Sequence, residues 1–355
     1  DTTLLQSAPS TMALAQHKRP VTSRAAENLF WLGRYTERAE NSIRLAQIVL
    51  NHVGGEEPSS RPLMAWLSAT AHENSLVLPG VPAAEQSARV FARSLMAGLS
   101  PVPGTPLAEQ SYSVGFNLRA LKAAASQVRE RLSQEHWHLI ERTETCFARD
   151  CAALSTDAEY ATVEALTALQ NASELLAAIT GAQTDRMVRD DGWRLLSIGR
   201  HIERLATLSR ALALGLQTGS VHEPAGFEAM VALFDSTITF HAQYQQRRDM
   251  PALLDLLVID RDNPRSLAWV AQTLRGRIAK IEAAAGTPGE SAATGIPEAS
   301  DLSLVALCAQ DAEGRHATLE EYLGRCVRGV MGLSDVLATR YFTHSADALR
   351  HSVGA

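Results

Sequence analysis

Two stretches of this 355-residue chain carry the same charged signature. One reads LFWLGRYTER from Leu29, and the other reads LLSIGRHIER from Leu195, so that Gly33 matches Gly199 at an offset of 166 residues. An internal repeat constrains the fold more than any other feature of the chain, because each copy predicts one unit that buries its apolar face against the other. We therefore predict a body built from two related halves.

A second set of matches recurs at a different offset, 146 residues. Its members keep their order in both halves: Asn117, Arg119, Leu121, Arg129 and Arg131 correspond to Asn263, Arg265, Leu267, Arg275 and Arg277. A longer connection in the first half explains why the two offsets differ. Pro- and Gly-rich breaks at 54–62, 79–82 and 101–106 are where we expect that connection.

The composition favours helices throughout. Hydrophobic residues make up 46% of the chain and aromatic residues only 5%, and the β-branched and aromatic clusters typical of strands are sparse. Apolar stripes at helical spacing predict one long helix that is capped by Ser23 and ends before Gly54, a flexible loop over 283–300, and further helices near 62–72, 83–98, 113–134, 136–152, 158–180, 190–217, 225–245, 250–259, 264–285, 301–311 and 315–343. Helices joined by short connections pack as a bundle, so the expected fold class is all-α.

The predicted domain organisation is simple. Residues 1–22 are polar and lack periodicity, which indicates a linker or the tail of an upstream region. Residues 23–350 form the helical domain, with pseudo-repeats at about 23–150 and 158–345. Because the chain begins with Asp1, we expect it to be a fragment or a processed piece.

Bulk properties exclude several classes of partner. A net charge of −6 argues against a nucleic-acid binder that works by general phosphate attraction. No apolar run reaches the ~18 residues of a membrane span. The four cysteines show no Cys-x-x-Cys spacing, which is typical of reduced core thiols in a cytosolic protein. We therefore predict a cytoplasmic protein without nucleic-acid or membrane partners.

The repeated motif supplies the candidate site. On a helix, its two arginines lie one turn apart on a line beside the apolar stripe, with the glutamate next to them. The mid-helix glycine permits close approach of a second helix. The candidate binding residues are those of both copies together with a nearby carboxylate: Glu27, Arg34, Glu37, Arg38, Arg200, Glu203 and Arg204.

These residues admit three interpretations. The glutamates could bridge arginines of their own or a facing helix and so pin the two halves together. The four arginines could instead meet in a cleft that binds an anionic group, with the three glutamates holding them in place. Finally, the charges could be solvated surface groups. The residues alone leave the choice open.

Three motifs in this chain resemble those of one known family. SRAAENLFWLGRYTERAEN at 23–41 closely resembles the opening of the bacterial Alpha-E domain family, RDDGWRLLSIGRHIER at 189–204 is similar to its second motif, and DRDNPRS at 260–266 to its third. The similarity spans 23 to about 345. It implies an all-helical fold. One departure is the stretch 124–127, where the family usually shows Glu-Asn-Ala-Arg and this chain has Ala-Ala-Ser-Gln, although Trp137 is present.

The resemblance also implies a functional context. Members of the family are encoded beside, or fused behind, circularly permuted ATP-grasp ligases, which implies amide-bond or peptide chemistry. Residues 1–14 are similar to the stretch that joins the two regions in such fusions. The chain is therefore expected to be the C-terminal part of an ATP-grasp/Alpha-E fusion, with the ligase region as its partner and an anionic or peptide substrate.

No self-sufficient active site is visible in the sequence. Glu135-x-x-His138 and Glu313-x-x-His316 match the spacing of di-iron bundles, but two such pairs are close to what chance supplies, so we predict no metal and no cofactor.

The leading hypothesis is a helical accessory module that is not catalytic alone and positions the substrate of an ATP-grasp ligase. One alternative is an enzyme that uses Glu37, Glu203 and neighbouring arginines for acid–base work on an amide, which requires one of these carboxylates to be exposed in a cleft with a perturbed pKa. The other is a structural oligomerisation scaffold.

Overall fold

The described part of the chain is helical. The computed structural model describes residues 21–53, 59–106, 109, 112–155, 158–245, 247–286, 289–298 and 302–342, and no strand occurs among them. The all-α prediction is thus confirmed. The tail predicted at 1–22 lies outside these residues except for its last two positions. No helix in the described ranges has both the length and the apolarity needed to cross a bilayer.

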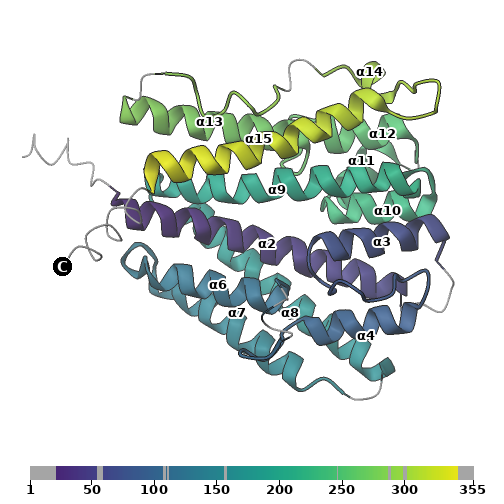
Figure 1. Ribbon diagram of the computed structural model, residues 1–355. Coiled ribbons are helices and arrows are strands. Elements are labelled where there is room, and N and C mark those ends of the chain that lie inside the picture. The colour runs from purple at the N-terminus through teal and green to yellow at the C-terminus, as the bar shows by residue number, and fades with distance from the viewer. Residues whose placement is uncertain are drawn as a thin grey trace, which may run out of the picture.

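Two long helices form the centre of the molecule. α2 (Ser23–Val53) and α9 (Asp191–Thr218) share the most extensive contact between any two elements and run side by side in the same direction (Figure 1). Their apolar residues are almost fully excluded from solvent, among them Leu29, Leu32, Ile198 and Leu205. Each central helix therefore loses its whole apolar face to neighbours, which is the main driving force for a bundle of this kind.

The remaining helices cover the central pair from two sides (Figure 1). On the α2 side lie α4 (Ala88–Gly98), α6 (Val114–Ser126), the turn η1 (Arg129–Arg131), α7 (Gln134–Ala152) and α8 (Ala158–Asp185). On the α9 side lie α13 (Leu267–Ala285), α14 (Leu304–Cys308) and α15 (Ala317–Tyr341). The end where α2 and α9 finish is covered by α3 (Arg61–Glu73), η2 (Ser220–His222), α10 (Pro224–Leu233), α11 (Thr237–Tyr244), α12 (Met250–Leu254) and the π-helical turn η3 (Asp255–Ile259).

Side-chain caps set several helix starts. Asp190 accepts the backbone N–H of Trp193 at 3.0 Å and so begins α9, and Ser266 does the same for α13 through Trp269 at 3.1 Å. For α2 the predicted cap is wrong by one position. Ser23 is already helical, and the hydroxyl of Thr22 accepts the N–H of Ala25 at 3.2 Å.

Several predicted segments differ in detail. The helix expected at 83–98 begins at Ala88, and the one expected at 301–311 is reduced to Leu304–Cys308. The helix expected at 113–134 ends at Ser126 and is followed by η1, because Ser133 caps the next helix through the N–H of His136. The helix expected at 225–245 divides into α10 and α11 at Asp235, whose positive φ of 53° interrupts the helix. The loop expected to be flexible is packed over 289–298, where Ile296 is buried and its carbonyl accepts from Arg275 at 2.7 Å.

The two halves are not separated in space. α8 follows the predicted boundary at 150–158, yet it packs on α2 and α7, which belong to the first half. The helices that carry the second set of matched residues take comparable positions, since α6 packs on α2 and α13 packs on α9. The duplication itself stays a prediction, while the buried apolar residues form one continuous core from Ala26 to Phe342.

Candidate functional site

The glycines of the repeated motif bring α2 and α9 into backbone contact. A Cβ added to Gly33 would lie 2.0 Å from the carbonyl oxygen of Leu196, and one added to Gly199 would lie 2.2 Å from that of Phe30. Leu196 and Phe30 are themselves separated by the repeat offset of 166 residues. The predicted role of these glycines in close packing is confirmed, because no other residue fits at either position.

At this contact, each glutamate of the motif pairs with the arginines of the other helix. Glu37 of α2 accepts two hydrogen bonds from Arg204, at 2.6 and 2.8 Å, and two from Arg200, at 3.2 and 3.3 Å. Glu203 of α9 accepts from Arg34 and forms an ion pair with Arg38 at 2.9 Å. The ion pairs are exchanged between the two copies of the motif, so the charges link α2 to α9.

Glu37 is the most buried member of this network, with 0% of its side chain exposed, whereas Glu203 is 8% exposed. Burial alone raises the pKa of Glu37, but the charges of Arg204 and Arg200 and the hydrogen bond from Arg204 outweigh it and hold the pKa well below its usual range. The surrounding arginines therefore favour the ionised form of Glu37. Its two oxygens are already occupied by guanidinium groups, as in a bidentate pair.

Residues outside the repeated motif extend the network from α2 to the α10–α13 region. Arg265 bonds to Glu40 and forms ion pairs with Glu37 at 3.5 Å and Asp235 at 3.2 Å, while Arg44 reaches Asp235 at 3.0 Å. The candidate residues chosen from the sequence include none of these four, Glu40, Arg44, Asp235 and Arg265. Arg265 carried a usable signal, since it lies in the third motif and matches Arg119 at the second repeat offset.

The side of the network near α15 is lined by aromatic rings. The guanidinium of Arg34 lies 4.9 Å from the ring centre of Trp31 and donates to the hydroxyl of Ser334 at 3.0 Å. Arg38 lies over Tyr35 at 5.9 Å, and the Trp31 and Tyr35 rings are stacked. These contacts fix the arginines in place and add stabilisation of about 0.5–1 kcal/mol per cation–π pair.

The structure brings together six of the seven candidate residues. Arg34, Glu37, Arg38, Arg200, Glu203 and Arg204 all meet at the α2–α9 contact. Glu27 is half-buried and forms no hydrogen bond or ion pair with any described residue. The geometry matches the interpretation in which the glutamates pin the two helices, because the arginines are already paired and the carboxylates face them instead of a cleft.

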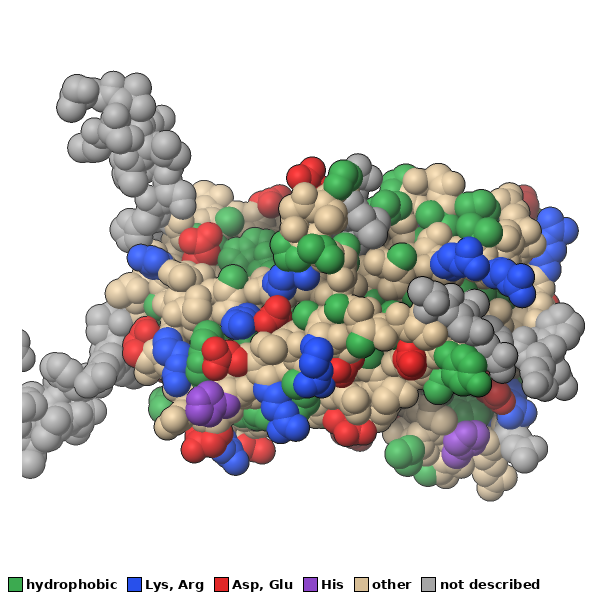
Figure 2. Space-filling view, turned by 90° about the horizontal axis from the view of Figure 1, so that it is seen from below, with side chains coloured by type: hydrophobic (Ala, Val, Ile, Leu, Met, Phe, Trp, Pro, Cys, Tyr) green, Lys and Arg blue, Asp and Glu red, His purple; other side chains and the backbone are tan. Residues whose placement is uncertain are grey.

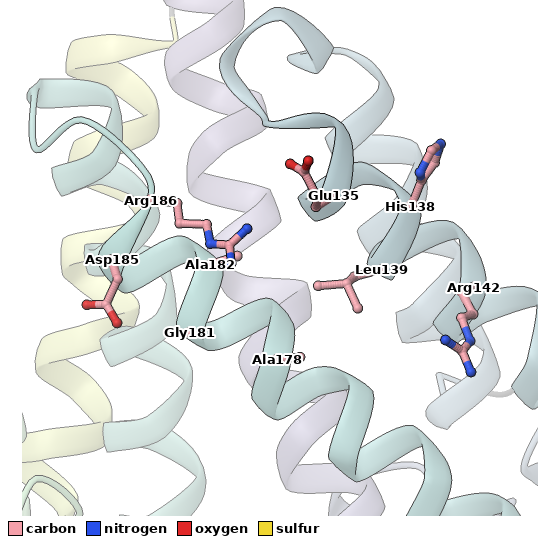
Figure 3. Close-up of a pocket in the computed structure, with 9 residues that line it drawn as sticks. All are labelled: Glu135, His138, Leu139, Arg142, Ala178, Gly181, Ala182, Asp185 and Arg186. Carbon is pink, nitrogen blue, oxygen red and sulfur yellow. The ribbon is translucent and has the colours of Figure 1, made fainter.

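A groove lies elsewhere, between α7 and α8. It encloses about 660 Å³ and is lined by Glu135, His138, Leu139 and Arg142 of α7 and by Ala178, Gly181, Ala182, Asp185 and Arg186 along and just after α8. Figure 3 shows Leu139 and the guanidinium of Arg186 pointing into the space between the helices. None of its charged side chains forms an ion pair with another described residue. The groove thus offers charges of both signs to a ligand.

Gly181 lines the α8 side of this groove and has no side chain that would fill it. Nothing lies within 4 Å of the position that its Cβ would occupy, so packing does not require glycine there. A glycine within a helix costs about 1 kcal/mol relative to alanine. A groove that must stay open to a ligand is one physical reason to keep it.

Metal-ligating side chains, cysteines and surface charges give weaker indications of a site. No three His, Cys, Asp or Glu side chains gather around a possible metal position within the described ranges. All four cysteines are free; Cys326 is buried and the others are half-buried. Figure 2 shows acidic and basic side chains interspersed on the face that lies at the bottom of Figure 1, so this face carries no field of one sign.

Comparison with known proteins agrees with the motifs. Residues 21–342 match the family model Alpha-E, described as a predicted alpha-helical domain with a conserved ER motif. Two of the Glu-Arg pairs of this chain, Glu37-Arg38 and Glu203-Arg204, lie at the α2–α9 contact.

Three curated relatives are 27% identical over 276 residues: uncharacterized protein Rv2567 of Mycobacterium tuberculosis (strain ATCC 25618 / H37Rv), uncharacterized protein Mb2597 of Mycobacterium bovis and uncharacterized protein MT2643 of Mycobacterium tuberculosis (strain CDC 1551 / Oshkosh). The match covers 74% of this chain but 30% of each relative's length. No solved structure matches. On the extent of the family match, the chain belongs to the Alpha-E family.

Proposed function

We propose that this chain is an accessory module of an ATP-grasp-type amide or peptide ligase, and that it positions an anionic or peptide substrate without being catalytic alone. The observation that carries the non-catalytic part is the burial of both motif glutamates against arginines. A general base needs access to a proton and a pKa near the working pH. Glu37 has neither, because it is fully buried and its pKa is lowered.

The ligase partnership is supported by two observations of a different kind. The sequence resembles a family whose members accompany ATP-grasp ligases. In addition, the matched part makes up 30% of the curated relatives' length, which leaves room in those proteins for a further domain. A rigid helical body beside a ligase suits a positioning role, since it orders a substrate at little cost in its own entropy.

The α7–α8 groove is the place where we expect the substrate to lie. A peptide presents a cationic amine, an anionic carboxylate and polar amides, and the groove provides exposed groups of both signs, including Arg142, Arg186, Glu135 and Asp185. Leu139 adds an apolar contact. The motif arginines are not available for this task, because they are engaged with Glu37 and Glu203.

The test is an assay of ATP-dependent amide formation by an ATP-grasp ligase that is encoded with this chain, with and without the chain. The chain alone should neither turn over ATP nor form amides, and its addition should stimulate the ligase. Substitution of Arg142→Gln with Arg186→Gln should raise the substrate KM about tenfold, the loss of roughly one charge-assisted contact. Binding between chain and ligase, measured by calorimetry, should not change.

A matched control is Arg149→Gln, since Arg149 is exposed on the same helix α7 but lies outside the groove. It should leave the KM unchanged. Robust ATP turnover by the isolated chain would contradict the proposal in favour of an independent enzyme. Equal stimulation of the ligase by the groove variants and by the unchanged chain would indicate that the chain is a structural scaffold instead.

A further inference from the structure

Two arginines share one buried tryptophan at the start of α9. The guanidinium carbon of Arg277, on α13, lies 4.5 Å from the ring centre of Trp193, and that of Arg189 lies 5.3 Å from it. The indole is 6% exposed and its N–H donates to the carbonyl of Gln183 at 2.8 Å, which fixes the ring. Both cationic groups therefore lie against the same fixed indole ring.

The carboxylates next to these arginines are already paired with others. Asp190 accepts from Arg131, and Asp191 accepts from Arg194 at 2.6 Å. Arg189 and Arg277 form no hydrogen bond or ion pair with any residue that the structure describes. Four arginines thus face two aspartates at this site, and Arg189 and Arg277 are the two that lack a counter-charge.

The lack of a counter-charge is clearest at Arg277. Its Nε atom is shielded from solvent and has no hydrogen-bond partner. Burial lowers the pKa of Arg277, and the charges of Arg189 and Arg194 lower it further. A buried donor without an acceptor destabilises the folded chain. The contrast with Arg131 is informative, because Arg131 has the matching position in the first half and does have a carboxylate, Asp190.

We propose that Arg189 and Arg277 form a binding site for an oxyanion, a carboxylate or phosphate group of a small molecule or peptide. Both guanidinium groups lie by the indole, which fixes them while their N–H edges remain able to donate. An oxyanion there would supply the missing counter-charge and accept from the terminal N–H groups, in the geometry that guanidinium groups recognise. The site stands on this chain's own residues, so its failure in a binding experiment leaves the proposed ligase partnership untouched.

The experiment measures the melting temperature of the whole chain at pH 7.5 and constant ionic strength, with inorganic phosphate or succinate replacing sodium chloride. The unchanged chain should gain about 2 °C at a tenfold excess over Kd. Arg277→Gln and Arg189→Gln should each abolish that gain. Arg149→Gln, which changes an exposed arginine that pairs with Asp150, should retain it.

Each outcome decides something. A gain with phosphate alone assigns the site to phosphate groups, a gain with succinate alone assigns it to carboxylates, and a gain with both shows that the shared oxyanion chemistry suffices. No gain with either anion overturns the proposal, and so does a gain that survives in both variants. Arg189 is exposed, so Arg189→Gln keeps the test informative if Arg277→Gln does not fold.

Discussion

At the residue scale, Glu37 holds the charged network of the α2–α9 contact together. Its carboxylate is fully buried and pairs with Arg200, Arg204 and Arg265. Removing one partner of a buried ion pair leaves the others without compensation, which costs about 3–5 kcal/mol. We therefore expect Glu37→Gln to lower the free energy of unfolding by that amount, as measured by urea denaturation.

A surface ion pair provides the control for this prediction. Glu321 pairs with Arg328 on α15, and both side chains are about two-thirds exposed, at 65% and 66%. Because exposed pairs contribute little, Glu321→Gln should change the free energy of unfolding by less than about 0.5 kcal/mol. Equal effects of the two substitutions would mean that Glu37 does not hold the helices together.

His136 gives a pH dependence with a definite sign. Burial, with a further contribution from the charge of Arg186, lowers the pKa of His136 to about 4. Between pH 6.5 and 4 the unfolded chain binds a proton at this position while the folded chain does not, so stability falls as the pH falls. The loss from this residue should be about 2 kcal/mol at pH 5.

His136→Leu should remove that part of the decline, as measured by urea unfolding at pH 7 and pH 5. His138 lies on the same helix but is exposed, and His138→Leu should keep the full decline. An identical pH slope for the His136 variant and the unchanged chain would show that His136 is protonated in the folded state.

At the element scale, the distance between α2 and α9 depends on Gly33 and Gly199. An added methyl group at Gly33 would collide with the backbone oxygen of Leu196, which a side-chain rotation cannot relieve. The helices would have to move apart and strain the packed core. We expect Gly33→Ala to reduce the free energy of unfolding by about 2 kcal/mol or more.

A glycine-to-alanine substitution at a helix position without close neighbours should instead stabilise the protein. Gly276 lies within α13 and nothing is within 4 Å of its Cβ position. Because alanine restricts the unfolded chain, Gly276→Ala should increase the free energy of unfolding by about 0.5–1 kcal/mol. Chemical denaturation of both variants checks the pair, and a stabilising Gly33→Ala would contradict the close contact.

At the scale of the whole molecule, the fold has one core and not two. Buried apolar residues are continuous from α2 to the end of α15, and the exchanged ion pairs cross from one half to the other. We therefore expect a single thermal transition in calorimetry, with equal calorimetric and van't Hoff enthalpies. Two resolved transitions, one for each predicted half, would show that the halves unfold independently.

Part of this architecture could be predicted from the sequence because it depends on local patterns. Helix periodicity and the low aromatic content identified the all-α class and most helices of the bundle. The spacing Gly-Arg-x-x-Glu-Arg identified the residues at the α2–α9 contact, since a helix fixes which side chains share a face. Predictions were poorest at breaks such as Asp235 and η1, where turn geometry and caps from later residues decide the helix ends.

Which charge pairs with which is a property of the tertiary structure alone. The sequence determined that Glu37, Glu203 and their neighbouring arginines lie beside an apolar stripe, but pairing, an open cleft and exposure to solvent were all compatible with that pattern. Only the packing of α2 on α9 decided that the glutamates face the opposing arginines. The groove between α7 and α8 and the contact of Arg277 with Trp193 also arise from packing, because they join residues far apart in the chain whose proximity no local periodicity encodes.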